Sequence, residues 1–164
     1  MTLGPDTRLG PYEILTLIGV GGMGEVYRGR DPRLKRNIAI KVLPEMTAAD
    51  PERRARFERE AQSIAALNHP NIFTIHSVEE ADGVVFLTME YVDGKPLSDL
   101  IVKGGLPLPQ ILNGSIPLAD AVSAAHQKDI THRDLKPANV MITDGRVKVL
   151  DFGLAKLIAR FVVY

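Results

Sequence analysis

Apolar and polar residues alternate along much of the first half of the chain, a pattern typical of strands with one buried face. Five strands are predicted, over residues 12–18, 25–30, 37–43, 72–78 and 84–90. The glycine-rich turn Gly19–Gly24 joins the first two strands, and the turn residues Ala81-Asp82-Gly83 separate the last two.

One helix interrupts this series of strands. Asp50 supplies an N-cap and Pro51 a first-turn proline, so a helix is predicted from there to about Leu67, where His69-Pro70-Asn71 ends it. Five strands and one helix make a small first lobe.

The second half has a different pattern. Residues 96–128 are helical in tendency but carry Pro107, Pro109, Gly114 and Pro117. Because a proline inside a helix removes a hydrogen bond and clashes one turn back, the helix is predicted only from about Pro117 to Gln127, with Ser115 as a possible cap. Two short β segments, 140–143 and 147–150, flank the turn Asp144-Gly145.

The composition of the chain excludes some classes of function. The chain has 164 residues, 45% of them hydrophobic and 24% charged, as in ordinary globular proteins. Its 20 basic and 20 acidic residues balance, so a nucleic-acid or membrane-surface partner is not indicated. The absence of Cys excludes disulfides and thiolate metal sites. Without a leader-like segment or a long apolar run, a cytoplasmic location is expected.

The glycine-rich turn is the first candidate for chemistry. Residues 19–26 match G-x-G-x-x-G-x-V, in which glycines let backbone N–H groups approach phosphate oxygens. An ordinary glycine-rich hairpin would look the same. A dinucleotide-binding fold is not favoured, because a strand follows the turn where that fold needs a helix.

A lysine and a glutamate form the second candidate. Strand alternation puts Ala39 and Lys41 on one face, where Lys41 is either an exposed charge or a phosphate ligand beneath the glycine turn. On the predicted helix, Glu60 lies within the apolar stripe of Phe57 and Ile64. A carboxylate among inward-facing positions needs a partner, and Lys41 is the predicted one.

The most specific segment is residues 132–139, with Asp-Phe-Gly at 151–153. Asp134 would accept the proton of an attacking hydroxyl, and Lys136 would steady a phosphoryl group. Asn139 and Asp151 would hold Mg²⁺. The alternative is a polar loop, a β-hairpin and a chance Asp-Phe-Gly, and the spacing of the four residues favours phosphoryl transfer. His69, His76 and His126 lack ligand-spaced partners, which favours structural roles.

In this order, these elements resemble the signature set of the protein kinase family. The resemblance implies an α+β, protein-kinase-like fold with a five-stranded antiparallel sheet and one helix in the N-lobe. It divides the chain into an N-terminal extension (1–11), a nucleotide-binding N-lobe (12–92) and a partial, mainly helical C-lobe (93–164). Residues 135–139 are similar to serine/threonine kinases, and the glycine loop with residues 59–62 to their bacterial, eukaryotic-like branch.

The resemblance also implies roles. Lys41 and Glu60 would form the ion pair, Asp134 with Lys136 would carry catalysis, and Asn139 and Asp151 would bind Mg²⁺, while His132 and Phe152 would be packing anchors. ATP would be held by the glycine loop, the strand residues near it and the segment from Met89 to Val92. The residues implied are Ile18, Gly19, Val20, Gly21, Gly22, Met23, Gly24, Val26, Ala39, Lys41, Met89, Glu90, Val92 and Met141.

The sequence departs from the family after Gly153, because the activation segment and the later helices are not in it. The second lobe is therefore expected to be incomplete and to leave apolar surface uncovered. An amphipathic stripe in residues 154–164 suggests a helix that covers this surface, self-associates or docks on a partner, or else an accidental end.

Three functions stay open: a kinase that transfers the γ-phosphate of ATP to Ser or Thr of a protein substrate, a non-catalytic ATP-binding scaffold or regulatory module, and a non-functional fragment.

Overall fold

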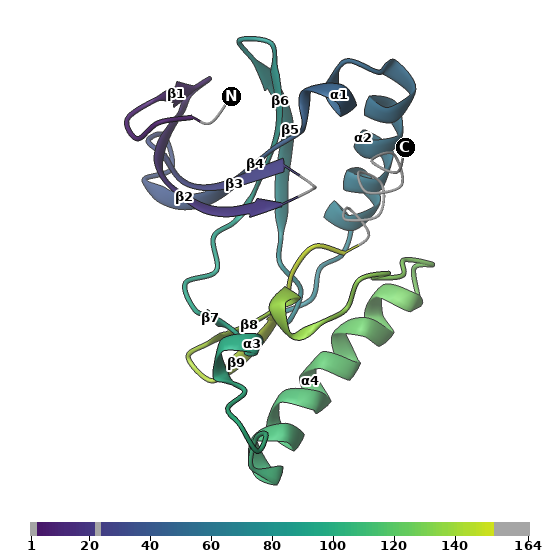
Figure 1. Cartoon of the computed structure of the whole chain (residues 1–164). Helices are drawn as coiled ribbons and strands as arrows, with labels where there is room; N and C mark the ends of the chain where they lie inside the picture. Colours follow the sequence, from purple (N-terminus) through teal and green to yellow (C-terminus); the bar gives the residue numbers. More distant parts are fainter. Residues whose placement is uncertain (1–2, 22–23, 153–164) are drawn as a thin grey trace. The chain divides into compact units, whose positions relative to one another are not determined.

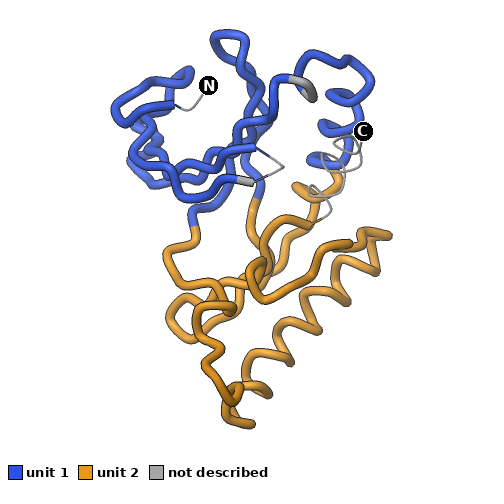
Figure 2. The backbone as a smooth tube through the Cα atoms, viewed as in Figure 1, with its two compact units in different colours: residues 1–62, 75–91, 157–164 blue, residues 63–74, 92–156 orange. Residues whose placement is uncertain are grey.

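Two groups of strands organise the chain, a six-stranded sheet and a three-stranded sheet (Figure 1). The structure is a computed structural model, and it describes residues 3–21 and 24–152. The described residues fall into two compact units (Figure 2). Unit 1 holds residues 3–62 and 75–91, and unit 2 holds residues 63–74 and 92–152. Residues 63–74, predicted as part of the first lobe, thus group with unit 2.

The sheet of unit 1 is antiparallel throughout and has the order β1-β2-β3-β4-β6-β5. Its strands are β1 (Arg8–Leu9), β2 (Tyr12–Gly21), β3 (Gly24–Asp31), β4 (Arg36–Val42), β5 (Ile75–Ala81) and β6 (Val84–Glu90). All five predicted strands are present, as β2 to β6.

One face of this sheet forms the hydrophobic core of unit 1. Tyr27, Ile40 and Phe86 lie in this core, and each is 0% exposed. Residues directly opposite on antiparallel strands share a face, and Tyr27 pairs with Ile40 in the register of β3 and β4. The alternation along β4 therefore sends Ala39 and Lys41 to the other face.

Strand β1 was not predicted. Arg8 and Leu9 pair with Glu13 and Tyr12, and Leu9 is 2% exposed. The backbone N–H of Ile14 also donates to the carbonyl of Thr7 at 2.9 Å. The segment predicted as an extension thus belongs to the sheet. A two-residue strand is too short to give an alternating pattern, so the sequence carried no signal for it.

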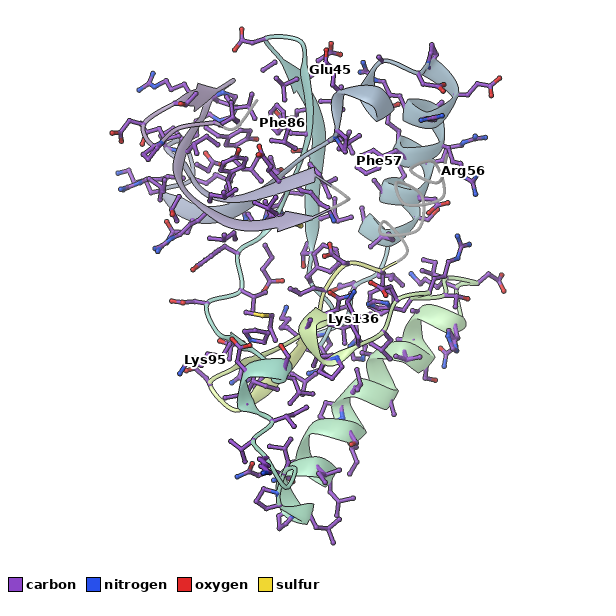
Figure 3. The ribbon with its side chains drawn as sticks, viewed as in Figure 1. Glu45, Arg56, Phe57, Phe86, Lys95 and Lys136 are labelled. Carbon is purple, nitrogen blue, oxygen red and sulfur yellow. The ribbon has the colours of Figure 1, made fainter. Side chains whose placement is uncertain are left out.

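Two helices accompany the sheet, the four-residue α1 (Glu45–Ala48) and α2 (Pro51–Ala65). Asp50 caps α2 as predicted, because its Oδ1 accepts the backbone N–H groups of Glu52 at 3.0 Å and Arg53 at 3.2 Å. Phe57 and Arg56 point to opposite sides of α2 (Figure 3), and Phe57 is buried. Arg54 joins this helix to β5 through Glu80 at 2.7 Å.

Unit 2 contains the sheet β7-β8-β9, formed by β7 (Lys95–Pro96), β8 (Val140–Thr143) and β9 (Arg146–Val149). Its helices are α3 (Leu97–Leu100), α4 (Leu108–His126) and the 3₁₀ turn η1 (Pro137–Asn139). Asp144 and Gly145 join β8 to β9 with φ of 47° and 72°, the conformation of a type I′ hairpin turn, where a turn was predicted. Helix α4 contacts β9.

The predicted start of the helix in residues 96–128 was wrong. Helix α4 begins at Leu108, after Pro107, and continues through Gly114 and Pro117, so Ser115 lies inside it and is no cap. Pro109 stands in the first turn, where its missing N–H has no intrahelical partner to lose. Pro117 removes one hydrogen bond within a 19-residue helix, and the helix continues through it.

Unit 2 leaves apolar side chains uncovered, as expected. Leu108, Leu112 and Ile116 of α4 are 66%, 50% and 69% exposed. A cavity of about 400 Å³ lies among α3, α4 and β8–β9, with Leu100, Ile111, Leu118 and Val147 in its lining. The predicted amphipathic tail, 154–164, lies outside the described residues. Within the described part of the chain, no helix combines the length and apolar character that crossing a membrane requires.

The cap of α2 gives the first testable prediction. Replacing Asp50 by Ala removes the acceptor of two backbone N–H groups and should lower the free energy of unfolding by about 1 kcal/mol, as measured by urea denaturation. Asp50→Asn keeps the cap and should change stability by a few tenths of a kcal/mol at most. Equal losses in both variants would show that the carboxylate does not act as a cap.

Candidate active site

In unit 1, the sheet face opposite the core carries the predicted nucleotide-binding residues. Val26 of β3 stands opposite Lys41 of β4, and Lys41 opposite Leu87 of β6. In the next row, Ala39 stands opposite Met89. Val26, Ala39, Lys41 and Met89 therefore form one patch, which three strands hold in fixed register.

Lys41 is 1% exposed, which rules out the alternative that it is an ordinary exposed charge. A buried ammonium is stable only with polar partners, and Lys41 interacts with at least one such group. Glu60 forms an ion pair with Arg56, one turn earlier on α2, at 3.7 Å. The pairing of Glu60 with Lys41 stays a prediction.

The glycine turn joins β2 to β3. Gly21 pairs with Gly24 at the end of the ladder. Gly24 has φ of 101°, and a Cβ there would stand 2.0 Å from the carbonyl oxygen of Val42, so only glycine fits. Ile18 and Val20 are 48% and 72% exposed on β2. Gly22 and Met23 lie outside the described residues.

Unit 2 carries the other candidate residues. Asp134 and Lys136 lie in the loop after α4, and their Oδ2 and Nζ atoms are 2.9 Å apart. Figure 3 shows Lys136 in this loop. The side-chain nitrogen of Asn139, at the end of η1, donates to the carbonyl of Asp134 at 2.8 Å and to its Oδ2 at 3.2 Å. Three of the predicted residues are thus in direct contact.

Asp134 is held in its charged form. The hydrogen bond from Lys136 is the largest influence and lowers the pKa of this carboxyl below its ordinary value, and Asn139 acts in the same direction. Partial burial opposes the shift. A carboxylate that is ionised at neutral pH can accept a proton, which the predicted base requires.

His132 joins the loop to the segment that ends in Asp151. Its Nε2 is 2.7 Å from the carbonyl oxygen of Leu150, and its Nδ1 is 3.3 Å from the backbone nitrogen of Asp134. A carbonyl only accepts, so Nε2 carries the proton and Nδ1 accepts from Asp134. Burial lowers the pKa of this imidazole, which agrees with a neutral ring.

Phe152 packs on the same histidine. The two rings have centroids 4.7 Å apart, and the side chains are 3% and 0% exposed for His132 and Phe152. This confirms that the two residues are packing anchors. Arg133 and Asp151, which lie next to these anchors, have φ of 66° and 55°, a backbone conformation that costs about 1–2 kcal/mol for a residue other than glycine.

The metal ligands predicted from the sequence, Asn139 and Asp151, fit Mg²⁺ in chemistry. Because Asn139 uses its amide nitrogen to hold Asp134, its oxygen is turned away from that contact. An amide oxygen with a carboxylate is a hard oxygen donor set, which Mg²⁺ prefers. In the described ranges, 3–21 and 24–152, no cluster of three or more His, Cys, Asp or Glu side chains could hold a metal.

Leu87, which was not among the predicted residues, is 0% exposed and stands opposite Lys41 on the same face of unit 1. The alternation of β6, in which Leu87 shares a face with Met89, contained the signal. The remaining predicted positions are Gly19 of β2, Glu90 at the end of β6, Val92 after it, and Met141 on β8.

Comparison with known proteins agrees with these features. Residues 12–162 match the protein kinase domain family. The chain belongs to this family. It is 46% identical over 153 residues to a probable serine/threonine-protein kinase, SCO3848, of Streptomyces coelicolor, and this match covers 90% of the chain. PrkC of Bacillus subtilis, a serine/threonine-protein kinase, is 45% identical over 148 residues, which are 89% of the chain.

Solved structures of kinase domains are also similar to this chain. A crystal structure of the Mycobacterium tuberculosis PknI kinase domain superposes with a TM-score of 0.80 at 35% identity and covers 99% of the chain. This kinase chain spans 69% of that structure, and 23% of each of the two curated relatives above.

The contact between Lys136 and Asp134 can be tested by titration. In Lys136→Met, the pKa of the Asp134 carboxyl should rise back toward its ordinary value, because the largest cause of its depression is removed. Carbon-detected NMR of the side-chain carboxyl measures the shift. The stabilisation that this pair gives the folded kinase domain is present at neutral pH and is lost as the pH falls through the lowered pKa.

Lys95→Met is the matched control, since it removes one exposed lysine from β7 of the same unit. It should leave the titration of Asp134 unchanged. The same pKa of Asp134 in all three proteins would contradict the role given to Lys136.

Proposed function

We propose that this chain carries the nucleotide-binding and phosphoryl-transfer residues of a serine/threonine protein kinase, which moves the γ-phosphate of ATP to a Ser or Thr hydroxyl of a protein. The observation that supports this most strongly is the direct contact of Asp134 with both Lys136 and Asn139. In this kinase family, one carboxylate, one lysine and one metal-binding amide act on the same phosphoryl group.

Asp134 is the proposed base. Its ionised carboxylate accepts the proton of the attacking hydroxyl, while Lys136, which lies 2.9 Å from it, steadies the negative charge of the transferring group. Lys136 therefore has two tasks, because it also keeps Asp134 ionised before the hydroxyl arrives.

The face of unit 1 is the proposed nucleotide platform. Val26, Ala39 and Met89 present apolar surface to a purine, and the main chain from Glu90 to Val92 offers hydrogen-bonding groups at its edge. Lys41 and the glycine turn supply an ammonium and backbone N–H groups for the phosphates. Glu60 would pair with Lys41 once it leaves Arg56.

Mg²⁺ is the proposed cofactor, held by Asn139 and Asp151, and when bound it neutralises charge on the phosphates. The proposed place of action, where the chain meets its protein substrate, is the cytoplasm. Self-association or docking of a partner through residues 154–164 is a further proposal.

A second candidate is a module that binds ATP without transferring phosphate. The ion pair between Arg56 and Glu60 favours it, because Arg56 competes with Lys41 for this carboxylate. Binding and transfer therefore need separate measurements.

Binding is tested by thermal unfolding. At a concentration of 100 Kd, Mg·ATP should raise the midpoint by about 5–10 °C, since a ligand that binds only the native state adds about 2.7 kcal/mol at that concentration. Lys41→Met should reduce this rise, because the phosphates lose their ammonium partner. The absence of any shift in the wild-type chain would contradict both candidates.

Transfer is tested with labelled ATP and a generic protein substrate. Asp134→Asn should lower the rate by about 10²–10⁴-fold, the usual contribution of a general base. Asp144→Asn removes the same charge from the turn of unit 2, where φ of 47° suits Asn, and should keep the full rate. If nucleotide binds but phosphate never reaches protein, the second candidate is correct.

A further inference from the structure

The nucleotide-binding face of unit 1 carries an arginine that the proposed function does not use. Arg28 of β3 stands opposite Ala39 of β4 and opposite Thr16 of β2. It is two residues from Val26 on the same strand, so both side chains leave the sheet on the same face. Arg28 therefore borders the residues proposed to hold the purine.

Burial of part of the Arg28 guanidinium at this position costs free energy. Its Nε is buried and has no hydrogen-bond partner in the part of the chain that the structure describes. A buried N–H without an acceptor lowers stability, so another contact of the guanidinium must offset that cost. Leucine would fill this position on an apolar face without the cost.

The contact that Arg28 does make is with Tyr91. The guanidinium carbon lies over the aromatic ring, 5.0 Å from its centroid, well within the range of a cation–π interaction. Tyr91 directly follows β6 and stands between Glu90 and Val92, two residues proposed for the purine. Arg28 thus links the middle of the sheet to the chain segment that leaves it.

We propose that Arg28 is a positioning residue that fixes the main chain around Tyr91 for purine recognition. A segment that is already ordered loses less conformational entropy when the ligand binds, and its hydrogen-bonding groups are already oriented. That the ligand is a purine nucleotide rests on the proposed function. The contact between Arg28 and Tyr91 is present in the free protein and does not depend on that function.

Hydrogen exchange tests the contact without any ligand. In Arg28→Leu, the backbone amides of residues 90–93 should exchange about 2- to 30-fold faster, the factor that corresponds to the loss of a cation–π interaction. Tyr91→Leu should have the same effect, and the double variant should add little to either. Arg30→Leu is the matched control, because it removes an exposed arginine from the same face of β3 and should leave these amides unchanged.

Ligand binding tests the consequence. Arg28→Leu should weaken adenosine and Mg·ATP by the same factor, about 2- to 30-fold, because the segment that it positions meets the purine and not the phosphates. Arg28→Lys keeps the cation and should recover part of the affinity. Thermal unfolding of each variant shows that it is folded.

Each outcome has a distinct meaning. Unchanged exchange at residues 90–93 in both single variants overturns the proposal, and so does a loss of affinity for Mg·ATP without a loss for adenosine, which would mean that Arg28 acts on the phosphates by charge. If the wild-type chain binds neither ligand, the proposed function fails and the purine role fails with it. Faster exchange would in that case still support the contact between Arg28 and Tyr91.

Discussion

The hydrogen bond from Nε2 of His132 to the carbonyl of Leu150 joins the two segments of unit 2 that carry its candidate catalytic residues, and the backbone N–H of Leu150, which donates to the carbonyl of Asn139 at 2.8 Å, joins them a second time. His132 stands two residues before Asp134, and Leu150 directly precedes Asp151. The bond from His132 needs a proton on Nε2, whereas the hydrogen bond that Nδ1 accepts from the backbone N–H of Asp134 needs a neutral ring, and burial, which lowers the pKa of His132, favours the neutral ring. The left-handed backbone of Arg133 and Asp151 persists beside it, because packing against Phe152 and this bond leave few alternatives.

Unit 1 depends on a different constraint. Side chains alternate strictly between the two faces of its sheet, and the two faces carry different kinds of residues. One face is closed by aromatic and branched side chains, among them Tyr27, Ile40 and Phe86. The register that closes this core also sets Lys41 beside Val26 and Leu87 on the other face. A slip of one residue would exchange the two faces, so stability and the candidate nucleotide platform are specified by the same pairing.

Much of the fold could be predicted, because its signals are local. Strand alternation gave β2 to β6, the side chain of Asp50 marked the start of α2, and Asp144-Gly145 marked a hairpin. Strands β1 and β7 have two residues each and therefore no period to detect. The start of α4 was missed because a proline costs a helix one hydrogen bond and a local clash, and in α4 the helix continues through Pro117 in spite of that cost.

The candidate site could be predicted as a set of residues but not as a set of contacts. Spacing identified Asp134, Lys136 and Asn139, but not their contacts, of which the one between Asn139 and Asp134 depends on the turn η1. Likewise, the apolar stripe of α2 singled out Glu60 as a residue in need of a partner, and Glu60 forms an ion pair with Arg56, one turn away on the same helix, while its pairing with Lys41 stays a prediction. Whether Glu60 also meets Lys41 depends on tertiary distances that no sequence period encodes.

The central claim, that Asn139 and Asp151 hold the metal of a bound nucleotide beside Asp134, can be tested directly by amide NMR with Mn²⁺ in place of Mg²⁺. Adding Mn·ATP should broaden the amide signals of residues 134, 139 and 151 selectively, and Asn139→Ala should remove much of that broadening. Broadening that is absent, or that centres on another part of the chain and persists in Asn139→Ala, would contradict the claim.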